Sequence, residues 1–157
     1  MSIVGIDGIP YPYYKRKLAC EQRIASSGIP YTILRATQFH ELIASVARAV
    51  ERLPPAPLPL DFRFQTVAAA DVAERVAELI GGEPSGDILN FGGPEVLSLE
   101  RMAEAWKEVR GRPRRVVRLR LPGKVARAFR EGRNTCPEQA VGRQRWGEFV
   151  ASEPPIP

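Results

Sequence analysis

The feature that most constrains the fold is an alternation of short apolar runs with longer stretches of helical periodicity. Strands are predicted at 2–6, 31–36, 62–67, 87–91 and 114–121. Helices are predicted at 13–27, 38–52, 70–80, 99–110, 122–132 and 143–150. A helix between two strands returns the chain so that the strands run parallel. The sequence therefore predicts an α/β fold with a mostly parallel sheet, rather than a helical bundle or a sandwich.

Individual side chains refine this outline. The helix at 13–27 is expected to end before Gly28, and Ser98 is a suitable N-cap for the helix after it. The proline-rich stretch at 54–60 is predicted to be an extended connector, because proline lacks the amide donor of a helix. The face that the first helix should bury carries Leu18, Ala19, Ile24 and Ala25. Trp106 and Trp146 are predicted to anchor the core.

Length and composition indicate one ordinary globular domain. The chain has 157 residues, of which 44% are hydrophobic and 26% charged, so disorder and fibrous architectures are disfavoured. No apolar run reaches the roughly 18 residues of a membrane span, and the first residues lack the pattern of a secretory signal. The sequence thus predicts no membrane association and a cytoplasmic location.

A metal site is not expected. The two cysteines, Cys20 and Cys136, lie far apart in the sequence, and His40 is the one histidine. None of these three has a partner at metal-ligand spacing. Both cysteines are flanked by apolar residues, so we expect them to be buried or half-buried in a structural role.

The net charge of +5 comes from an excess of arginine that gathers between Arg101 and Arg145. A basic face can bind the phosphates of a cofactor or of nucleic acid. However, the run RGRPRRVVRLR has no interleaved aromatic residues on which bases could stack. We therefore expect solvated arginines there, and nucleic acid is not expected as a partner.

Tyr13 and Lys17 form the motif with the clearest chemical meaning. Residues four apart share one face of a helix, so the ammonium of Lys17 could lie beside the hydroxyl of Tyr13. A nearby positive charge favours the phenolate, which would let Tyr13 exchange a proton with a substrate oxygen.

The spacing alone is only moderately specific. Four tyrosines and four lysines in 157 residues would produce it by chance about 0.1 times. A second match, Tyr11 with Lys15, is less suitable, because Tyr11 precedes Pro12 and is disfavoured from helical angles. The alternative interpretation is that Tyr13 and Lys17 are surface residues of the helix with no catalytic role.

The order of segments supplies the context. The stretches SIVGID, PYYKRKLACEQRIASSGIPYTILRATQF, VAAADVAERVAELI and NFGGPEVLSLERMA resemble the atypical short-chain dehydrogenase/reductases of the NmrA-like, NAD(P)H-binding kind. The resemblance covers the carboxyl-terminal part of that family. It implies the carboxyl-terminal portion of a Rossmann-type doubly wound fold over 1–81, followed by a small substrate-side region over 82–157, in a single partial domain.

The resemblance also implies roles for individual residues. Tyr13 would protonate a substrate carbonyl oxygen, Lys17 would hydrogen-bond the nicotinamide ribose and tune Tyr13, and Ser2 would orient the substrate. The residues that would bind the cofactor NAD(P) are Lys17, Arg35, Ala36, Thr37 and Gln38. Phe39 and His40 would line the substrate pocket, although periodicity alone places Phe39 in the core and makes His40 a residue of the polar face of the helix or of the boundary between its polar and apolar faces.

One part of the family pattern is missing. No Gly-x-x-Gly-x-x-Gly or Gly-x-Gly-x-x-Gly stands between a strand and a helix, and these glycines normally hold the pyrophosphate. Three hypotheses remain open: a reductase of a small carbonyl or enone, a non-catalytic NAD(P)H-binding regulatory protein, and a truncated relic that cannot bind the cofactor alone. A sheet without its central strands would expose an edge and favour self-association.

Overall fold

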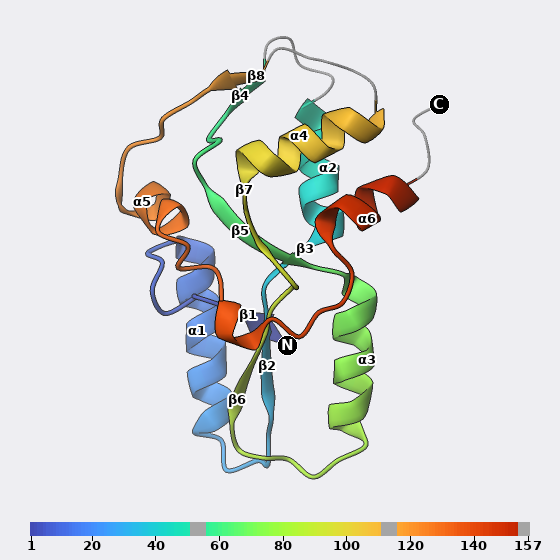
Figure 1. Cartoon of the computed structure of the whole chain (residues 1–157). Coiled ribbons are helices and arrows are strands. Elements are labelled where there is room, and N and C mark those ends of the chain that lie inside the picture. Colours follow the sequence, from blue (N-terminus) through green and yellow to red (C-terminus); the bar gives the residue numbers. More distant parts are fainter. Residues whose placement is uncertain (51–55, 111–115, 154–157) are drawn as a thin grey trace.

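The computed structural model describes residues 1–50, 56–110 and 116–153 (Figure 1). The helices are α1 (Pro12–Ala25), α2 (His40–Val50), α3 (Ala69–Ile80), α4 (Leu99–Arg110), α5 (Lys124–Arg130) and α6 (Trp146–Ser152), with a 3₁₀ turn at Pro137–Gln139. The strands are β1 (Ser2–Ile3), β2 (Ile33–Ala36), β3 (Gln38–Phe39), β4 (Ala56–Leu58), β5 (Arg63–Val67), β6 (Ile88–Phe91), β7 (Val96–Ser98) and β8 (Val116–Arg118). Parts of the predicted elements at 51–55 and 111–115 lie outside the described residues.

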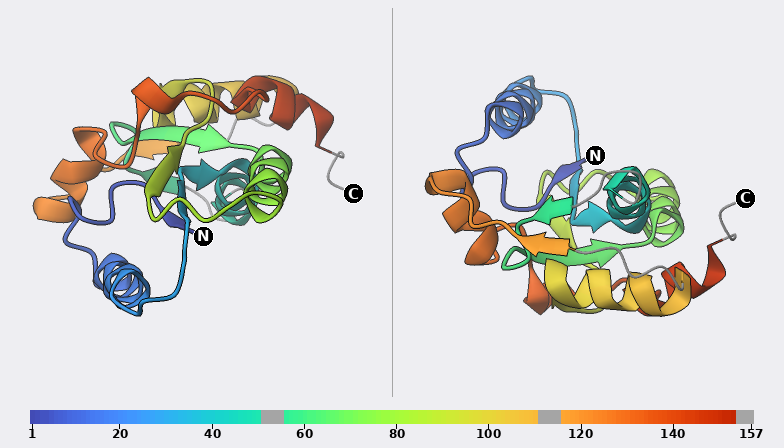
Figure 2. Two further views of the ribbon diagram at one scale, coloured as in Figure 1. Left: turned by 90° about the horizontal axis from the view of Figure 1, so that it is seen from below. Right: turned by 90° about the horizontal axis from the view of Figure 1, so that it is seen from above.

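A parallel sheet in the order β1-β2-β6 forms the lower half of the molecule. The helices α1 and α3 flank it on opposite sides (Figures 1 and 2). Alternation along β2 explains this arrangement, since Leu34 packs toward Val72 of α3 while Arg35 reaches Glu21 of α1. The prediction of an α/β fold with a parallel sheet is confirmed.

The upper half contains the sheet β3-β5-β7 and the pair β4-β8, with α2, α4 and α6 beside them (Figure 1). Its core includes the two predicted anchors, Trp106 and Trp146, whose rings stack with centroids 6.1 Å apart. The indole of Trp146 also donates to the carbonyl of Met102 at 3.0 Å. The strands β6 and β7 both follow residue 81, yet β6 belongs to the lower sheet and β7 to the upper one. The predicted boundary at residue 81 therefore does not coincide with the division between the sheets.

The strand predicted at 2–6 ends at Ile3, because the chain turns at Gly5. Gly5 has φ of 78°, and a Cβ there would lie 2.0 Å from the carbonyl oxygen of Arg133. Only a glycine permits this conformation and this close approach. β1 pairs with β2 along one edge, and β6 is the other outer strand of this sheet. Self-association through these edges stays a prediction.

Three short strands differ from the sequence-based expectation. Gln38 and Phe39 were predicted to be helical, but they pair with β5 as β3, and α2 begins at His40. The proline-rich connector contains β4, which tolerates Pro57 because a two-stranded sheet has free edges. The strand β7 was not predicted. Ser98 does cap α4, since its Oγ accepts from the amide of Arg101 at 3.2 Å.

The buried face predicted for α1 is confirmed only at Leu18, which is partly buried against the core. Ala19, Ile24 and Ala25 are exposed, and the helix instead buries Tyr14 and Glu21. Cys20, on the same helix, is exposed rather than buried, whereas Cys136 is buried as predicted. Figure 2 shows α1 standing apart from the helices of the upper half, so much of its surface meets no other element.

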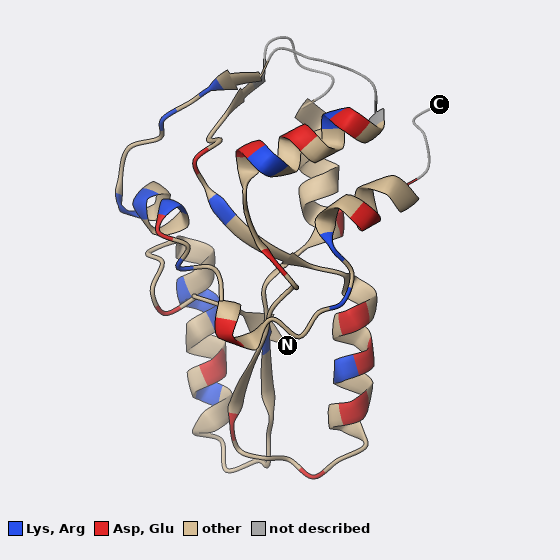
Figure 3. Ribbon diagram, viewed as in Figure 1, with Lys and Arg blue, Asp and Glu red and all other residues tan. Residues whose placement is uncertain are grey.

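The described arginines between Arg101 and Arg145 are largely engaged in ion pairs. Figure 3 shows them interspersed with acidic residues. The pairs are Arg101–Glu104, Arg118–Glu100, Arg127–Glu131, Arg130–Asp61, Arg133–Glu131, Arg143–Asp71, Arg143–Glu74 and Arg145–Glu95. Among the helices described, none is long and apolar enough to cross a membrane.

Gly93 lies where the two halves meet, and we expect the addition of one methyl group there to lower the stability strongly. A Cβ at Gly93 would lie 1.7 Å from the carbonyl oxygen of Thr66, which is backbone within β5 and cannot move without breaking the pairing with β3. We expect Gly93→Ala to lower the free energy of unfolding by about 3 kcal/mol. Gly147→Ala is the control, since no atom lies within 4 Å of its Cβ position. Equal urea midpoints for both variants would contradict this packing.

Candidate functional site

A cavity of about 550 Å³ opens where β1 and β2 end and α1 begins. We name it the Tyr13 cavity. Its lining residues are Met1, Ser2, Ile3, Tyr11, Tyr13, Tyr14, Lys17, Ala36, Thr37, Gln38, Phe39, Leu42, Val125 and Phe129. Seven of the nine candidate residues from the sequence therefore meet here: Ser2, Tyr13, Lys17, Ala36, Thr37, Gln38 and Phe39. Arg35 and His40 do not line it.

Tyr13 and Lys17 occupy the first turns of α1, which begins at Pro12. Proline suits this position because its fixed φ is helical and the first helical amide has no partner. The side chain of Tyr13 is 52% exposed, and its hydroxyl makes no hydrogen bond to the described residues. Lys17 Nζ donates to the carbonyl of Met1 at 3.1 Å, which holds the start of β1 against the helix.

Two further tyrosines surround Tyr13. The ring of Tyr14 lies 5.6 Å from that of Tyr11, edge to face, and 6.2 Å from that of Tyr13. Burial raises the pKa of Tyr14, and its tyrosine neighbours raise it further. Tyr14 therefore stays protonated at neutral pH and acts as a wall of the cavity, while Tyr13 lines the cavity with a half-exposed side chain.

Ser2, the first residue of β1, and Thr37, which follows β2, place polar atoms beside the end of β2. Ser2 is 6% exposed, and its buried Oγ makes no hydrogen bond of ordinary geometry with the described residues, although the hydroxyl lies close enough to Glu21 to help lower the pKa of that carboxyl group. Thr37 is buried as well, and its Oγ1 accepts from the amide of Gly93 at 3.2 Å. Thr37 thus fixes the loop that follows β6, while the hydroxyl of Ser2 lies between the cavity and the carboxylate of Glu21.

Arg35 has a different environment from the one that a cofactor contact would need. Its guanidinium binds both carboxylate oxygens of Glu21, at distances down to 2.6 Å, and Asp7 at 3.1 Å. Burial would raise the pKa of Glu21, but the hydrogen bonds from Arg35 lower it. Because Glu21 and Asp7 occupy its donors, Arg35 links β2 to α1 and does not line the Tyr13 cavity.

His40 is fully buried and is the first residue of α2. Its Nε2 is 3.0 Å from the carbonyl oxygen of Gln144, and its ring stacks on Phe149 at 5.0 Å. The expectation that His40 lines the substrate pocket therefore does not match its position. Phe39 combines both expectations, since it borders the cavity and packs against the core around Val67.

The burial of His40 predicts a pH dependence of stability. Burial lowers its pKa below the ordinary value of 6.5, so the unfolded chain binds a proton more readily than the folded one. The stability is then complete above about pH 6.5 and falls as the pH drops through the lower folded pKa. Urea unfolding between about pH 5 and 8 should show this loss, and it should shrink in His40→Phe. An unchanged slope in that variant would exclude His40 as the cause.

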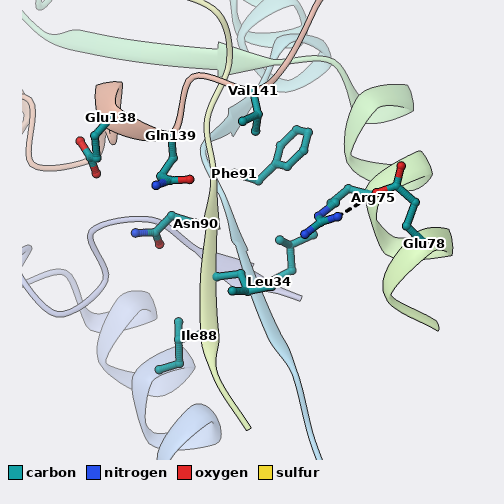
Figure 4. Close-up of a pocket in the computed structure, with 10 residues that line it drawn as sticks. Leu34, Arg75, Glu78, Ile88, Asn90, Phe91, Glu138, Gln139 and Val141 are labelled. Atoms are coloured by element: carbon teal, nitrogen blue, oxygen red, sulfur yellow. Dashed lines mark hydrogen bonds and ion pairs between the residues drawn. The ribbon is translucent and has the colours of Figure 1, made fainter. Parts of the chain in front are cut away.

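A second cavity, of about 600 Å³, borders β6. Glu138 and Gln139 lie on one side of that strand, and Arg75 and Glu78 of α3 on the other (Figure 4). Arg75 is already paired with Glu78 at 2.8 Å. With two carboxylates and a neutralised arginine, this cavity is poorly suited to an anionic cofactor, and no candidate residue from the sequence lines it.

Several lining residues of the Tyr13 cavity were not identified from the sequence. Leu42 comes from α2, and Val125 and Phe129 come from α5. Phe129 stacks on Phe62 at 5.3 Å, which carries α5 to the mouth of the cavity. The helical spacing of Val125 and Phe129 does reveal an apolar face, but nothing in the sequence says which element that face meets.

The cavity matches the reactive end of a nicotinamide cofactor better than the whole cofactor. Lys17 could hydrogen-bond a ribose hydroxyl, and the hydroxyl of Ser2, which interacts with Glu21, could turn to a carbonyl or amide oxygen instead. The sequence contains no glycine-rich turn between a strand and a helix to hold a pyrophosphate. The residues present therefore fit the nicotinamide riboside portion.

No family model and no curated protein matches the sequence. The fold, in contrast, matches solved structures of NAD(P)-binding α/β proteins with a Rossmann-type fold. The chain spans 54 to 62% of the length of the structures it matches. It thus has a partial Rossmann-type fold.

Three solved structures illustrate the likeness. A new type of NADPH-dependent quinone oxidoreductase from Escherichia coli is 19% identical, covers 99% of this chain and 62% of its own, and has a TM-score of 0.64. UDP-glucuronic acid 4-epimerase from Bacillus cereus, in complex with NAD, is 17% identical over 97% and 56%, with a TM-score of 0.64. Triphenylmethane reductase from Citrobacter sp. is 14% identical over 99% and 60%, with a TM-score of 0.63.

Proposed function

We propose that the Tyr13 cavity is the substrate and nicotinamide end of an NAD(P)H-dependent reductase site of the atypical short-chain dehydrogenase/reductase kind. The observation that carries this proposal is the convergence of Ser2, Tyr13 and Lys17 with the segment 36–39 on one cavity. These residues come from β1, α1, the end of β2 and β3, and the sequence motif and the family resemblance predict the same set. The similar NADPH-dependent quinone oxidoreductase supports the same class of reaction.

In this proposal each residue has a defined task. A reduced nicotinamide, when bound, supplies the hydride for the substrate carbonyl carbon. Tyr13 donates its hydroxyl proton to the carbonyl oxygen, and the tyrosinate is reprotonated from solvent. A ketone then gives an alcohol, and a quinone gives a hydroquinone once the hydrogen added to carbon leaves as a proton and the second oxygen is protonated. Lys17 stabilises the tyrosinate through its positive charge, and Ser2 orients the carbonyl by turning its hydroxyl hydrogen from Glu21 to the substrate.

The lining of the cavity favours a neutral, apolar carbonyl substrate such as a quinone. Tyr11, Phe39, Leu42 and Phe129 provide aromatic and aliphatic walls. Lys17 is the one charged side chain among the described lining residues. The diphosphate of a nucleotide sugar would need several cationic partners, so a substrate like that of the similar epimerase is disfavoured.

Cofactor affinity is expected to be weak in this chain. Most affinity for a dinucleotide comes from the glycine-rich turn and the helix that follows it, and the sequence lacks that motif. The proposed site would therefore be the carboxyl-terminal part of a complete one. A chain preceded by, or associated with, a glycine-rich nucleotide-binding half would bind the cofactor more tightly.

Titration with NADPH and NADH tests the proposal. We expect binding to the purified chain at millimolar concentration, measured by calorimetry. Lys17→Ala should weaken it about tenfold, because hydrogen bonds to charged groups contribute about 1.5–3 kcal/mol. Lys15→Ala is the matched control, since Lys15 lies on the same helix and does not line the cavity. Absence of binding at millimolar cofactor would overturn the proposal.

A second function is favoured by one contact. Lys17 Nζ donates to the carbonyl of Met1, and this contact directs the ammonium toward β1. If that contact persists with the cofactor bound, Tyr13 lacks its activating charge and the protein binds NAD(P)H without turnover, as a regulatory protein would. Cofactor binding in the absence of any quinone reduction distinguishes this alternative.

A further inference from the structure

A further cavity, which is strongly apolar, is lined by residues of α2, α4, α6, β4, β5 and β8. These elements belong to the upper half of the molecule (Figure 1). We name this space the Trp106 cavity. It has a volume of about 320 Å³, within the range of about 300–1,000 Å³ that is typical of ligand pockets. Its lining includes the buried side chains of Met102, Trp106 and Trp146, and Val46, which is 49% exposed, lies at its edge.

One charged side chain borders this apolar space. Lys107, which follows Trp106 on α4, is the one charged residue among those described in the lining. Its ammonium makes no ion pair or hydrogen bond with the part of the chain that the structure describes, and the residue is exposed. An apolar cavity with a free cation at its edge is complementary to a molecule with an alkyl chain and one anionic end.

The Trp106 cavity is separate from the Tyr13 cavity, because the two share no lining residue. Phe62 and Phe64 border the Trp106 cavity, and both contact the ring of Phe129 in the wall of the Tyr13 cavity. On α2, Leu42 faces the Tyr13 cavity and Val46, one turn later, faces the Trp106 cavity. A ligand here would not compete with the proposed cofactor.

We propose that the Trp106 cavity binds a medium-chain monocarboxylate. A methylene group and a water molecule in the liquid have similar volumes, about 30 Å³, so an alkyl chain of about ten carbons fills the 320 Å³ of the cavity. The alkyl chain lies against Met102 and the two tryptophans, and the carboxylate meets Lys107. This site does not depend on the function proposed for Tyr13.

Decanoate is the probe, titrated calorimetrically into the full chain. The matched variants are Val46→Trp and Leu42→Trp, which alter half-exposed side chains one turn apart on α2 that border different cavities. We expect Val46→Trp to raise the Kd for decanoate at least tenfold, because the indole fills the entrance, and Leu42→Trp to leave it unchanged. If Leu42→Trp alone weakens binding, decanoate occupies the Tyr13 cavity and the proposal is wrong.

The charge is tested separately. Lys107→Met should raise the Kd for decanoate about threefold, as expected for an exposed ion pair, and should leave the Kd for decanol unchanged. Lys124→Met, which changes an exposed lysine away from the cavity, should affect neither. Urea midpoints confirm that each variant is folded. Equal decanoate affinity in the wild type, Val46→Trp and Lys107→Met, or no binding to the wild type, would overturn the proposal.

Discussion

Tyr13→Phe is expected to lower kcat for the NADPH-dependent reduction of a quinone by about 10²- to 10⁴-fold, the range for loss of a general acid. The affinity for NADPH should remain unchanged, because the phenyl ring keeps the shape of the cavity and only the hydroxyl is lost. Menadione, a neutral quinone, is a suitable substrate for the assay. Steady-state rates at saturating NADPH give the comparison.

Tyr11→Phe is the matched control for this experiment. Tyr11 lines the same cavity, is 47% exposed against 52% for Tyr13, and also stands four residues before a lysine. It precedes α1, however, so Lys15 is not placed beside it. We expect Tyr11→Phe to retain the wild-type rate within about twofold. A Tyr13→Phe variant with full activity would exclude this hydroxyl as the proton donor.

Arg35→Met is expected to cause the largest loss of stability, about 3–5 kcal/mol in the free energy of unfolding. The side chains of Arg35 and Glu21 are 11% and 5% exposed, so removal of the arginine leaves a buried carboxylate without its partner. Arg35 also holds Asp7 of the loop after β1. The substitution should therefore loosen the wall of the Tyr13 cavity as well.

Two comparisons isolate the buried ion pair. Arg75→Met breaks the exposed pair with Glu78 and should cost less than about 1 kcal/mol. The double variant Arg35→Met, Glu21→Leu should recover much of the loss, because it removes the unpaired charge together with its partner. Urea unfolding of the four proteins measures these differences. Equal costs for Arg35→Met and Arg75→Met would show that burial of the pair contributes nothing.

The parts of the fold that depend on local pattern were predictable from the sequence. Helical periodicity identified α3 nearly to the residue, and a β-branched run identified β2. The alternation of these elements indicated the parallel sheet. In contrast, Gln38 and Phe39 form a strand because β5 lies beside them, and the pairing of β4 with β8 joins segments about sixty residues apart. Such pairings depend on tertiary contacts that periodicity does not contain.

The candidate site was likewise predictable only in part, because some of its residues are identified by a motif and others depend on tertiary contacts. The motif and its surrounding segments selected Ser2, Tyr13 and Lys17, and the structure gathers them on one cavity. Arg35 was assigned to the cofactor by resemblance, but the sequence could not reveal that Glu21, on the facing helix, binds its guanidinium. The walls from α5 were equally hidden, because their position depends on the stacking of Phe129 with Phe62.

The central claim is that the nicotinamide end of the cofactor binds in the Tyr13 cavity, and amide chemical shifts test it most directly. In ¹H–¹⁵N spectra of the labelled chain titrated with NADPH, the amides of Ser2, Lys17, Thr37 and Gln38 should shift together with one saturation curve. The amides of Arg75 and Asn90, at the cavity beside β6, should not move. Shifts confined to Arg75 and Asn90, or no shifts at millimolar NADPH, would contradict the claim.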